Sequence, residues 1–327
     1  MTYIFSVVIP LFNKAHIIER TIQSVLNQTF TNFEVIIVND GSTDDGVKVI
    51  NRITDDSRIR IITQKNQGVS VARNRGVKES QFEYIAFIDG DDEWEPDFLL
   101  KIKEAIEKYP DASMYGTSSL HTDFITKDSY DSTISEFRNK IVKVDCFKIP
   151  NALPHTSAIV VKKSSLYKLD KELNVFPIGM KVCEDWACFH RLALSDNLIY
   201  IGIPLGIRNN NVEGQITGNK EVLEEQLFER WLDGVSYYNI IFNYWLNNNL
   251  NNKNFISFIR YNLRHNIKWF LINNNWEIIE MITQNLAEGI LSSNEIKLYK
   301  NKLKKPLSIH YINIKKLSSK ISKLFKT

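Results

Sequence analysis

The sequence has few cysteines and no long apolar run. Its 327 residues include three cysteines, an odd and sparse set that cannot form a disulfide framework. No basic segment followed by an apolar one opens the chain, so the sequence predicts no secretion signal. Apolar runs such as 6–12 and 199–207 are short and contain proline, far from the 18 or more residues of a membrane-spanning helix. These absences favour a reduced, cytoplasmic protein that does not itself cross a membrane.

Acidic residues are missing from the C-terminal end. Ten lysines and no acid follow Glu295, against a net charge of +3 for the whole chain, so the remainder carries −7. Over 313–326, at 100° per residue, apolar side chains including Ile314 and Ile321 share one arc and lysines lie opposite. This pattern predicts a basic amphipathic helix that either docks on the protein body or lies at an anionic membrane surface. No recognised nucleic-acid module accompanies the tail, so we expect no nucleic-acid partner.

The composition, 43% hydrophobic and 24% charged, is typical of a globular protein, and the length favours two domains. Short β-branched runs alternate with segments of helical spacing over the first hundred residues. Strands are predicted at 6–10, 33–38, 59–63 and 84–88, and helices at 17–26, 46–53 and 69–78. This order predicts an α/β fold with a mostly parallel sheet flanked by helices. Ligands of such sheets bind beyond the carboxyl ends of the strands.

The rest of the chain changes character twice. Further strands are predicted at 113–117 and 157–161, separated by a polar and mobile loop over 121–139, and a helix is predicted at 184–195. From about residue 220 the pattern is that of long helices. They are predicted at 222–246, 255–272 and 276–291, with an asparagine-rich loop at 247–254.

The segment IAFIDGDDEW, residues 85–94, places three carboxylates directly after a buried strand. Asp89, Asp91 and Asp92 repel one another there unless a cation or a polar ligand compensates. Ligands that are all oxygen suit Mg²⁺ or Mn²⁺. The alternative is a solvated turn or the N-cap of the next helix.

Two other strand ends carry side chains suited to a nucleotide. Asp40 in VNDGSTDD follows the second strand, although it would also serve to cap the helix that begins at Gly46. Pro10, Phe12 and Asn13 end the first strand, where the Phe12 ring is able to stack on a flat base. A nucleotide-binding edge is therefore one reading of these residues.

Charged residues open two of the predicted helices. NQGVSVARNRG, residues 66–76, carries Arg73 and Arg75, which either meet phosphate charge or are solvated. KVCEDWACFHRL, residues 181–192, begins its helix with Glu184 and Asp185, a pair that would also simply interact with the helix dipole.

These motifs, in their order and spacing, resemble family 2 glycosyltransferases of the GT-A fold. PLFN, VNDGSTDD, NQGVSVARNRG and FIDGDD resemble the nucleotide-sugar-binding half, and KVCEDWACFHRL resembles the ED motif of the acceptor half. The resemblance covers roughly residues 3–215. It implies a catalytic domain over 1–218, with its nucleotide-sugar half at about 1–100 and its acceptor half at about 101–218, followed by a helical region over 219–327.

The resemblance also implies roles for individual residues. Asp40 would bond the uracil ring, with Pro10 and Phe12 beside it. The residues implied to bind the nucleotide are Pro10, Phe12, Asn13, Asp40, Arg73 and Asp89. Asp91 would hold Mn²⁺ or Mg²⁺ on the diphosphate, and Asp92 would face the donor sugar.

On the acceptor side, the resemblance implies that Asp185 is the catalytic base, with Glu184 and Trp186 beside it. His155 either points into the acceptor cleft or is a structural histidine. In RNNNVEGQIT, residues 208–217, asparagines stand where many relatives carry a histidine. Phosphate oxygens and water are therefore expected to complete the coordination of the metal.

The function implied is that of an inverting, metal-dependent glycosyltransferase. Its donor would be a nucleotide diphosphate sugar, expected to be UDP-linked, and its acceptor a glycan or lipid-linked glycan of bacterial surface polysaccharide, lipooligosaccharide or capsule. It would work in the cytoplasm or peripherally on the inner face of the cytoplasmic membrane. Two alternatives stay open: a nucleotidyltransferase, although 10–17 lacks its glycine-rich phosphate loop, and a sugar-nucleotide-binding protein without catalysis.

Overall fold

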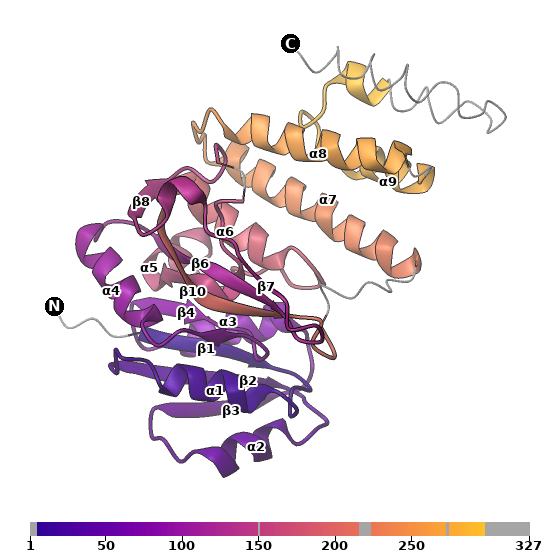
Figure 1. The fold of residues 1–327 in the computed structure, drawn as a ribbon. Coiled ribbons are helices and arrows are strands. Elements are labelled where there is room, and N and C mark those ends of the chain that lie inside the picture. The colour runs from indigo at the N-terminus through magenta and orange to yellow at the C-terminus, as the bar shows by residue number, and fades with distance from the viewer. Residues whose placement is uncertain (1–4, 150, 216–223, 273–274, 298–327) are drawn as a thin grey trace.

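The computed structural model describes residues 5–149, 151–215, 224–272 and 275–297 (Figure 1). The tail helix predicted near the C-terminus lies outside these residues. The alternation of strands and helices predicted for the first hundred residues is confirmed. The elements are β1 (Phe5–Leu11), α1 (Ile18–Leu26), β2 (Phe33–Asp40), α2 (Gly46–Ile53), β3 (Ile59–Gln64), α3 (Val69–Glu79) and β4 (Tyr84–Phe87).

The first half of the sheet is parallel throughout. Its strands lie in the order β3-β2-β1-β4, and each neighbouring pair is parallel. Helices cover both faces, which explains the apolar runs of β1 and β2. Helix α3 approaches β1 so closely that a Cβ on Gly76 would stand 2.3 Å from Val8 Cγ1, so this position requires glycine.

The second half of the sheet is mixed. It contains β6 (Met114–Asp123), β9 (Ile159–Lys162), β10 (Leu198–Asn210) and the short β5 (Glu93–Trp94). Strand β10 is parallel to β6, but β9 lies between β4 and β6 and runs antiparallel to both. The predicted parallel arrangement therefore holds for the first half, and the sheet as a whole is mixed. Because β9 is reversed, the residues that precede it continue past the carboxyl end of β4.

Some predicted boundaries are wrong. The segment 121–139 is not simply a loop, because β6 continues to Asp123 and pairs with β7 (Ser129–Asp131) in an antiparallel hairpin, followed by η1 (Ser135–Phe137). The strand predicted from residue 157 begins as a 3₁₀ turn, η2 (Thr156–Ala158). The remaining elements of this half are α4 (Phe98–Lys108), β8 (Ile141–Val144), α5 (Lys163–Leu169) and α6 (Glu184–Ser195).

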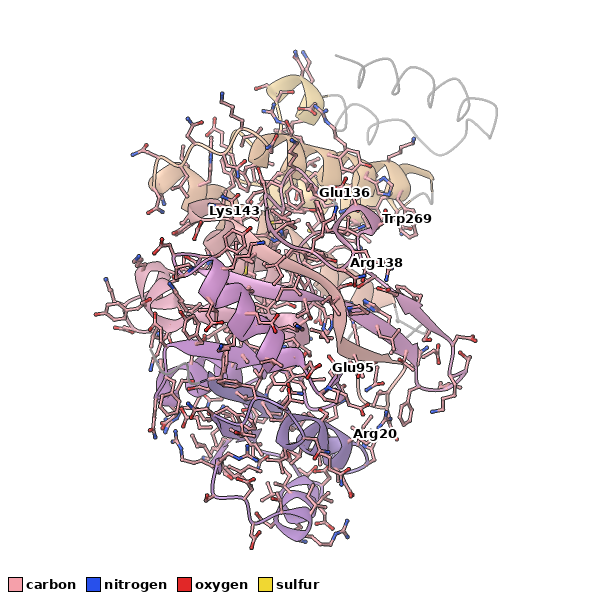
Figure 2. All side chains as sticks on the ribbon, turned by 60° about the vertical axis from the view of Figure 1, so that its left-hand side comes forward. Arg20, Glu95, Glu136, Arg138, Lys143 and Trp269 are labelled. Atoms are coloured by element: carbon pink, nitrogen blue, oxygen red, sulfur yellow. The ribbon has the colours of Figure 1, made fainter. Side chains whose placement is uncertain are left out.

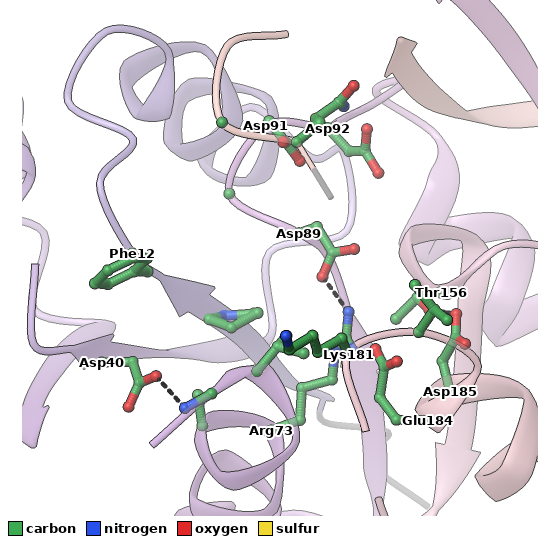
Figure 3. Close-up of a pocket in the computed structure, with 18 of the residues that line it drawn as sticks. Phe12, Asp40, Arg73, Asp89, Asp91, Asp92, Thr156, Lys181, Glu184 and Asp185 are labelled. Carbon is green, nitrogen blue, oxygen red and sulfur yellow. Dashed lines mark hydrogen bonds and ion pairs between the residues drawn. The ribbon is translucent and has the colours of Figure 1, made fainter. Parts of the chain in front are cut away.

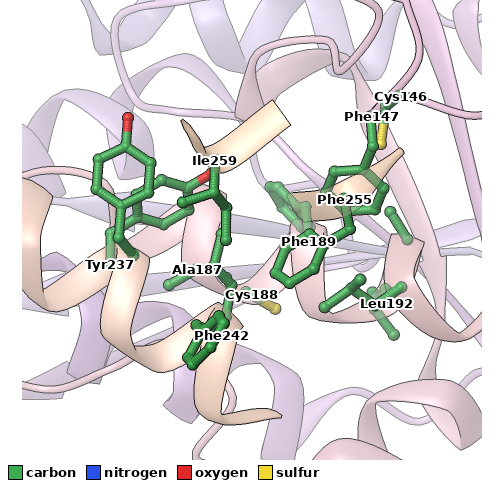
Figure 4. Close-up of a cluster of buried hydrophobic side chains, with 14 of the residues drawn as sticks. Cys146, Phe147, Ala187, Cys188, Phe189, Leu192, Tyr237, Phe242, Phe255 and Ile259 are labelled. Carbon is green, nitrogen blue, oxygen red and sulfur yellow. The ribbon is translucent and has the colours of Figure 1, made fainter. Parts of the chain in front are cut away.

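The long helices predicted after residue 220 are present as α7 (Glu224–Asn247), α8 (Phe255–Ile272) and α9 (Trp276–Asn285). Helix α7 packs against α6, and α9 packs against α7 and α8 (Figure 1). Phe189 and Leu192 of α6 belong to the same buried apolar cluster as Phe242 of α7 and Phe255 of α8 (Figure 4). Among the described residues, no helix is long and apolar enough to cross a membrane.

Candidate active site

A pocket of about 650 Å³ opens beyond the carboxyl ends of β1, β2 and β4 (Figure 3). All of the site residues predicted from the sequence except Asn13 line it. They are Pro10, Phe12, Asp40, Arg73, Asp89, Asp91, Asp92, His155, Glu184, Asp185 and Trp186. Segments separated by more than a hundred residues thus contribute to one cavity.

Asn13 shapes the turn behind the pocket. Its Oδ1 accepts the backbone N–H of Thr43 at 2.8 Å, and its own N–H is donated to the Ser42 hydroxyl at 3.2 Å. Its backbone is left-handed, with φ at 50°. The neighbouring Phe12 ring is 44% exposed and lines the pocket, which leaves a flat apolar surface free for a ligand.

Asp40 ties the end of β2 to the start of α3. Its carboxylate accepts the Gln64 side-chain amide at 2.8 Å and the backbone N–H groups of Gln67 and Gly68 at 3.0 and 2.8 Å. It does not cap α2, because the N–H of Gly46 bonds to Asp44 instead. A carboxylate offers about four acceptor positions, so Asp40 retains room for one more donor.

Arg73 joins the two halves of the site. Its guanidinium is buried and donates to Asp89 Oδ1 at 2.7 Å and to Glu184 Oε1 at 2.6 Å. Burial disfavours its charge, but the nearby carboxylates of Asp89, Glu184 and Asp185 raise the pKa of Arg73 above its ordinary value. Arg75, by contrast, is half exposed and pairs with Glu79 at 2.8 Å.

Asp91 is paired with a lysine that the sequence reasoning missed. Lys14 Nζ lies 2.8 Å from Asp91 Oδ2 and donates to the carbonyl oxygen of Glu213 at 3.2 Å. Lys14 lies in the β1–α1 connection, directly after the PLFN motif. This position next to a predicted nucleotide-binding motif is the sequence feature that could have identified it. A positive charge therefore already compensates Asp91 inside the pocket.

Asp92 is buried, and each of its carboxylate oxygens accepts one hydrogen bond. It accepts the Ser157 hydroxyl at 2.5 Å and the backbone N–H of Asn209 at 3.0 Å. Burial and repulsion from Asp91 and Asp89 raise the pKa of Asp92 well above its ordinary value. Both oxygens of Asp92 are thus held in place at the pocket wall.

The asparagine segment supports the acidic turn. Asn209 is buried, and its side-chain amide donates to the carbonyl oxygen of Asp91 at 2.8 Å and to the Glu93 carboxylate at 3.1 Å. Among the described residues, no group of three or more His, Cys, Asp or Glu side chains forms a metal cluster. Asp91 fits a divalent ion that takes one or two carboxylates and otherwise keeps water and substrate phosphate oxygens.

The two carboxylates of the ED pair differ in burial and in hydrogen-bond partners. Glu184 is buried at the start of α6, next to Cys183, whose φ of 65° is left-handed. Burial and repulsion from Asp185 raise the pKa of Glu184 to about 7, although Arg73 opposes this. Asp185 is less buried, and its carboxylate accepts the Thr156 hydroxyl at 2.6 Å and the backbone N–H of Trp186 at 2.7 Å.

Trp186 and His155 line the pocket near Asp185 and Asp92, respectively. Trp186 is 48% exposed beside Asp185, a surface on which a sugar ring is able to stack. His155 lines the pocket with its Nδ1 3.8 Å from Asp92 Oδ2. Burial, together with the charges of Arg208 and His121, lowers the pKa of His155 well below its ordinary value.

Further pocket residues escaped the sequence reasoning. Thr156 precedes the reversed strand β9, next to the predicted His155, and no motif in the sequence marks it. Arg230 comes from α7, beyond the segment with recognisable motifs. Lys181, which precedes the ED pair, also lines the pocket and pairs with Glu229 of α7 at 2.5 Å.

Comparison with known proteins identifies the family of the chain. The family model described as "Glycosyl transferase family 2" matches residues 6–171, about half of the chain. An uncharacterized glycosyltransferase of Nostoc is 30% identical over 233 residues, covering 66% of this chain and 69% of the relative. The chain belongs to glycosyl transferase family 2.

Other relatives match over shorter stretches. An uncharacterized glycosyltransferase of Rickettsia bellii is 49% identical over 87 residues, which cover 27% of this chain and 13% of the relative. One of Escherichia coli is 42% identical over 92 residues, or 28% of this chain and 27% of the relative. The matched segment thus spans about a quarter or less of these two relatives.

Solved structures share the fold at low identity. Residues 1–349 of Staphylococcus aureus TarS, in complex with UDP-GlcNAc, superpose with a TM-score of 0.69 at 17% identity, covering 88% of this chain and 82% of that one. A mannosyltransferase of Pyrobaculum calidifontis, in complex with GDP-Man and Mn²⁺, gives 0.51 at 16% identity, covering 72% and 62%. The architecture is therefore the GT-A fold with a helical region after it.

Proposed function

We propose that the protein is an inverting glycosyltransferase that moves a sugar from a UDP-linked donor to a hydroxyl of a glycan or lipid-linked glycan. The observation that carries this proposal is the joining of two sets of carboxylates in one pocket. Arg73 bonds Asp89 of the donor motif on one side and Glu184 of the ED motif on the other. The donor and acceptor motifs are thereby held at a fixed separation.

The proposed donor site follows the end of the parallel strands. Phe12 and Pro10 flank the base, and the remaining acceptor position of Asp40 receives the uracil N–H. Asp89, whose side chain is 32% exposed, is available to the ribose hydroxyls. The UDP-GlcNAc bound by TarS, which has the same fold, supports UDP as the nucleotide.

Asp91 is the residue proposed to hold Mn²⁺ or Mg²⁺. The bound ion would neutralise charge on the departing diphosphate. Lys14, already beside Asp91, adds a second positive group to this part of the pocket. The Mn²⁺ in the mannosyltransferase neighbour supports a divalent metal.

Asp185 is proposed as the base. It takes the proton from the acceptor hydroxyl while that oxygen attacks the anomeric carbon and the bond to the diphosphate breaks on the opposite side. A single displacement of this kind inverts the anomeric centre. Glu184 is less suited to the role because it is only 6% exposed and its carboxylate already accepts the Arg73 guanidinium at 2.6 Å.

The acceptor is proposed to be a bacterial surface glycan. The lysine-rich sequence after Glu295 supports an acceptor presented at an anionic membrane, such as lipid-linked polysaccharide, lipooligosaccharide or capsule precursors. The enzyme would then act in the cytoplasm, peripherally on the inner membrane face.

A product assay separates this proposal from its alternatives. The protein is incubated with a panel of UDP-sugars and Mn²⁺, with and without glycan acceptors, and free UDP and pyrophosphate are quantified. A transferase releases UDP and makes more of it with its acceptor, and a chelator abolishes this release. Pyrophosphate release would instead identify a nucleotidyltransferase, and binding without any release would identify a non-catalytic protein.

A further inference from the structure

Two adjacent hydroxyls in the turn before β9 face the two parts of the site. Ser157 is fully buried, and its hydroxyl donates to Asp92 Oδ2 at 2.5 Å while accepting the backbone N–H of Asp89 at 3.0 Å. Its carbonyl oxygen accepts the indole N–H of Trp94 at 2.5 Å. Ser157 therefore holds the acidic turn after β4 from three directions.

Thr156 serves the other part of the site. It is 3% exposed, and its hydroxyl donates to Asp185 Oδ2 at 2.6 Å, as Figure 3 shows by the closeness of the two side chains. The second oxygen of Asp185, Oδ1, accepts the backbone N–H of Trp186 at 2.7 Å. Together these two donors fix the plane of the carboxylate at the start of α6.

The reversed strand explains why these residues reach the site at all. In β9, Val160 is opposite Ala86 of β4, so the residues before β9 continue past the carboxyl end of β4. Consecutive residues of an extended or tightly turned chain direct their side chains differently. One dipeptide consequently reaches Asp92 with one side chain and Asp185 with the other.

We propose that Thr156 and Ser157 form a hydroxyl bridge that sets the position of the base relative to the donor. Thr156 is a positioning residue for Asp185, and Ser157 is a positioning residue for the Asp89–Asp92 turn. The inference rests on the proposed role of Asp185 as base. It adds that this turn fixes the distance between Asp185 and the acidic turn of the proposed donor site.

The proposal has a measurable energetic consequence. An aspartate that loses one of two donors gains rotational freedom about its side-chain bonds. A misplacement of about 1 Å at a reacting group costs on the order of 10²-fold in rate. Loss of the Thr156 hydroxyl should therefore lower kcat while leaving the donor site intact.

The test compares three variants, two of which replace a threonine hydroxyl by a methyl group of similar size. Thr156→Val removes the hydroxyl, and Thr156→Ser keeps it. The control is Thr117→Val, because Thr117 of β6 is equally buried and its hydroxyl has no partner among the described residues. We expect Thr156→Val to lower kcat roughly 10- to 100-fold, with less than about a threefold change in KM for the UDP-sugar, within ordinary context dependence. Thr156→Ser and Thr117→Val should remain near wild type.

The variant Ser157→Ala distinguishes the role of the Ser157 hydroxyl from that of the Thr156 hydroxyl. It removes a donor from Asp92 and an acceptor from Asp89, so we expect a higher KM for the UDP-sugar and weaker UDP binding by calorimetry, unlike Thr156→Val. Thermal melting of every variant identifies loss of folding. A Thr156→Val protein that melts lower but turns over normally would overturn the proposal, because its hydroxyl would then be merely structural.

A double variant distinguishes failure of this inference from failure of the proposed function. If Asp185 is the base and Thr156 acts through it, Thr156→Val should cost nothing further in an Asp185→Asn background. A normal rate for Asp185→Asn alone would reject the proposed base. A slow Asp185→Asn enzyme together with an additive loss from Thr156→Val would retain the base and overturn the positioning role.

Discussion

At the residue scale, the pairing of Lys14 with Asp91 bears on the metal ion that we propose Asp91 to hold. The two groups lie 2.8 Å apart, and the lysine side chain is 12% exposed. An incoming divalent ion would compete with Lys14 for the same carboxylate. The nucleotide-free protein should for this reason bind a metal weakly, and diphosphate binding should favour its entry.

Replacing Lys14 with methionine tests this competition. Without the competing cation, Lys14→Met should bind Mn²⁺ about tenfold more tightly in the absence of nucleotide, equivalent to about 1.4 kcal/mol. The bound fraction is measured by electron paramagnetic resonance of free Mn²⁺. Lys14→Arg, which retains the charge, is the control. Equal Mn²⁺ affinity in wild type and Lys14→Met would show that the pair does not oppose metal binding.

At the element scale, the sequence predicted the first half of the sheet well because β1, β2 and β4 are largely buried. Residues 7–11 of β1 and 35–38 of β2 form uninterrupted apolar runs, and the acidic motifs come at the ends of β2 and β4. The second half was harder to predict, since a four-residue antiparallel strand such as β9 has no periodicity that reveals its direction. The roles of Arg73 and Thr156 depend on partners more than 25 residues away, Glu184 and Asp185, which no local pattern discloses.

The contact between α6 and α7 predicts a pH dependence of stability. His190 of α6 is buried with its Nδ1 3.0 Å from the Tyr237 hydroxyl of α7, and burial lowers the pKa of His190 to about 4. In the unfolded chain a histidine has a pKa of about 6.5. At pH values between these two pKa values, the unfolded state binds a proton that the folded state does not. The free energy of unfolding therefore falls as the pH falls through this range.

The expected effect of His190 is about 3 kcal/mol of unfolding free energy lost between neutral pH and pH of about 4. Urea unfolding at a series of pH values measures it. The variant His190→Gln, which does not titrate, should have a flatter dependence by this amount, whatever its stability at neutral pH. Parallel curves for the two proteins would mean that His190 protonates equally in both states.

At the scale of the whole molecule, the helical region and the catalytic half share their interior. The apolar cluster around Phe189 includes side chains from α7, α8 and α9 as well as the sheet. At the pocket rim, Asp233 of α7 accepts the backbone N–H groups of Lys181 and Val182 at 2.7 and 3.1 Å. Unlike this apolar interior, the outside of the molecule carries charged side chains of both signs, such as Arg20 and Glu95 (Figure 2).

Truncation of the chain after residue 218 tests this shared interior. It would expose the apolar face of α6, including Phe189 and Leu192, which are at most 2% exposed in the whole protein. Exposed apolar area costs about 25 cal/mol per Å², so the truncated protein should lose cooperative unfolding and bind a hydrophobic dye. A truncated protein with a sharp melt and normal UDP binding would establish instead that residues 1–218 fold alone.

The most direct test of the account is the transfer rate of Asp185→Asn. This change keeps the size of the side chain and its contact with Thr156 but removes its basicity. With a donor and acceptor identified by UDP release, we expect transfer to fall about 10²- to 10⁴-fold, while calorimetry finds unchanged UDP affinity. Turnover within a few-fold of wild type, with UDP still bound, would contradict the assignment of Asp185 as the base.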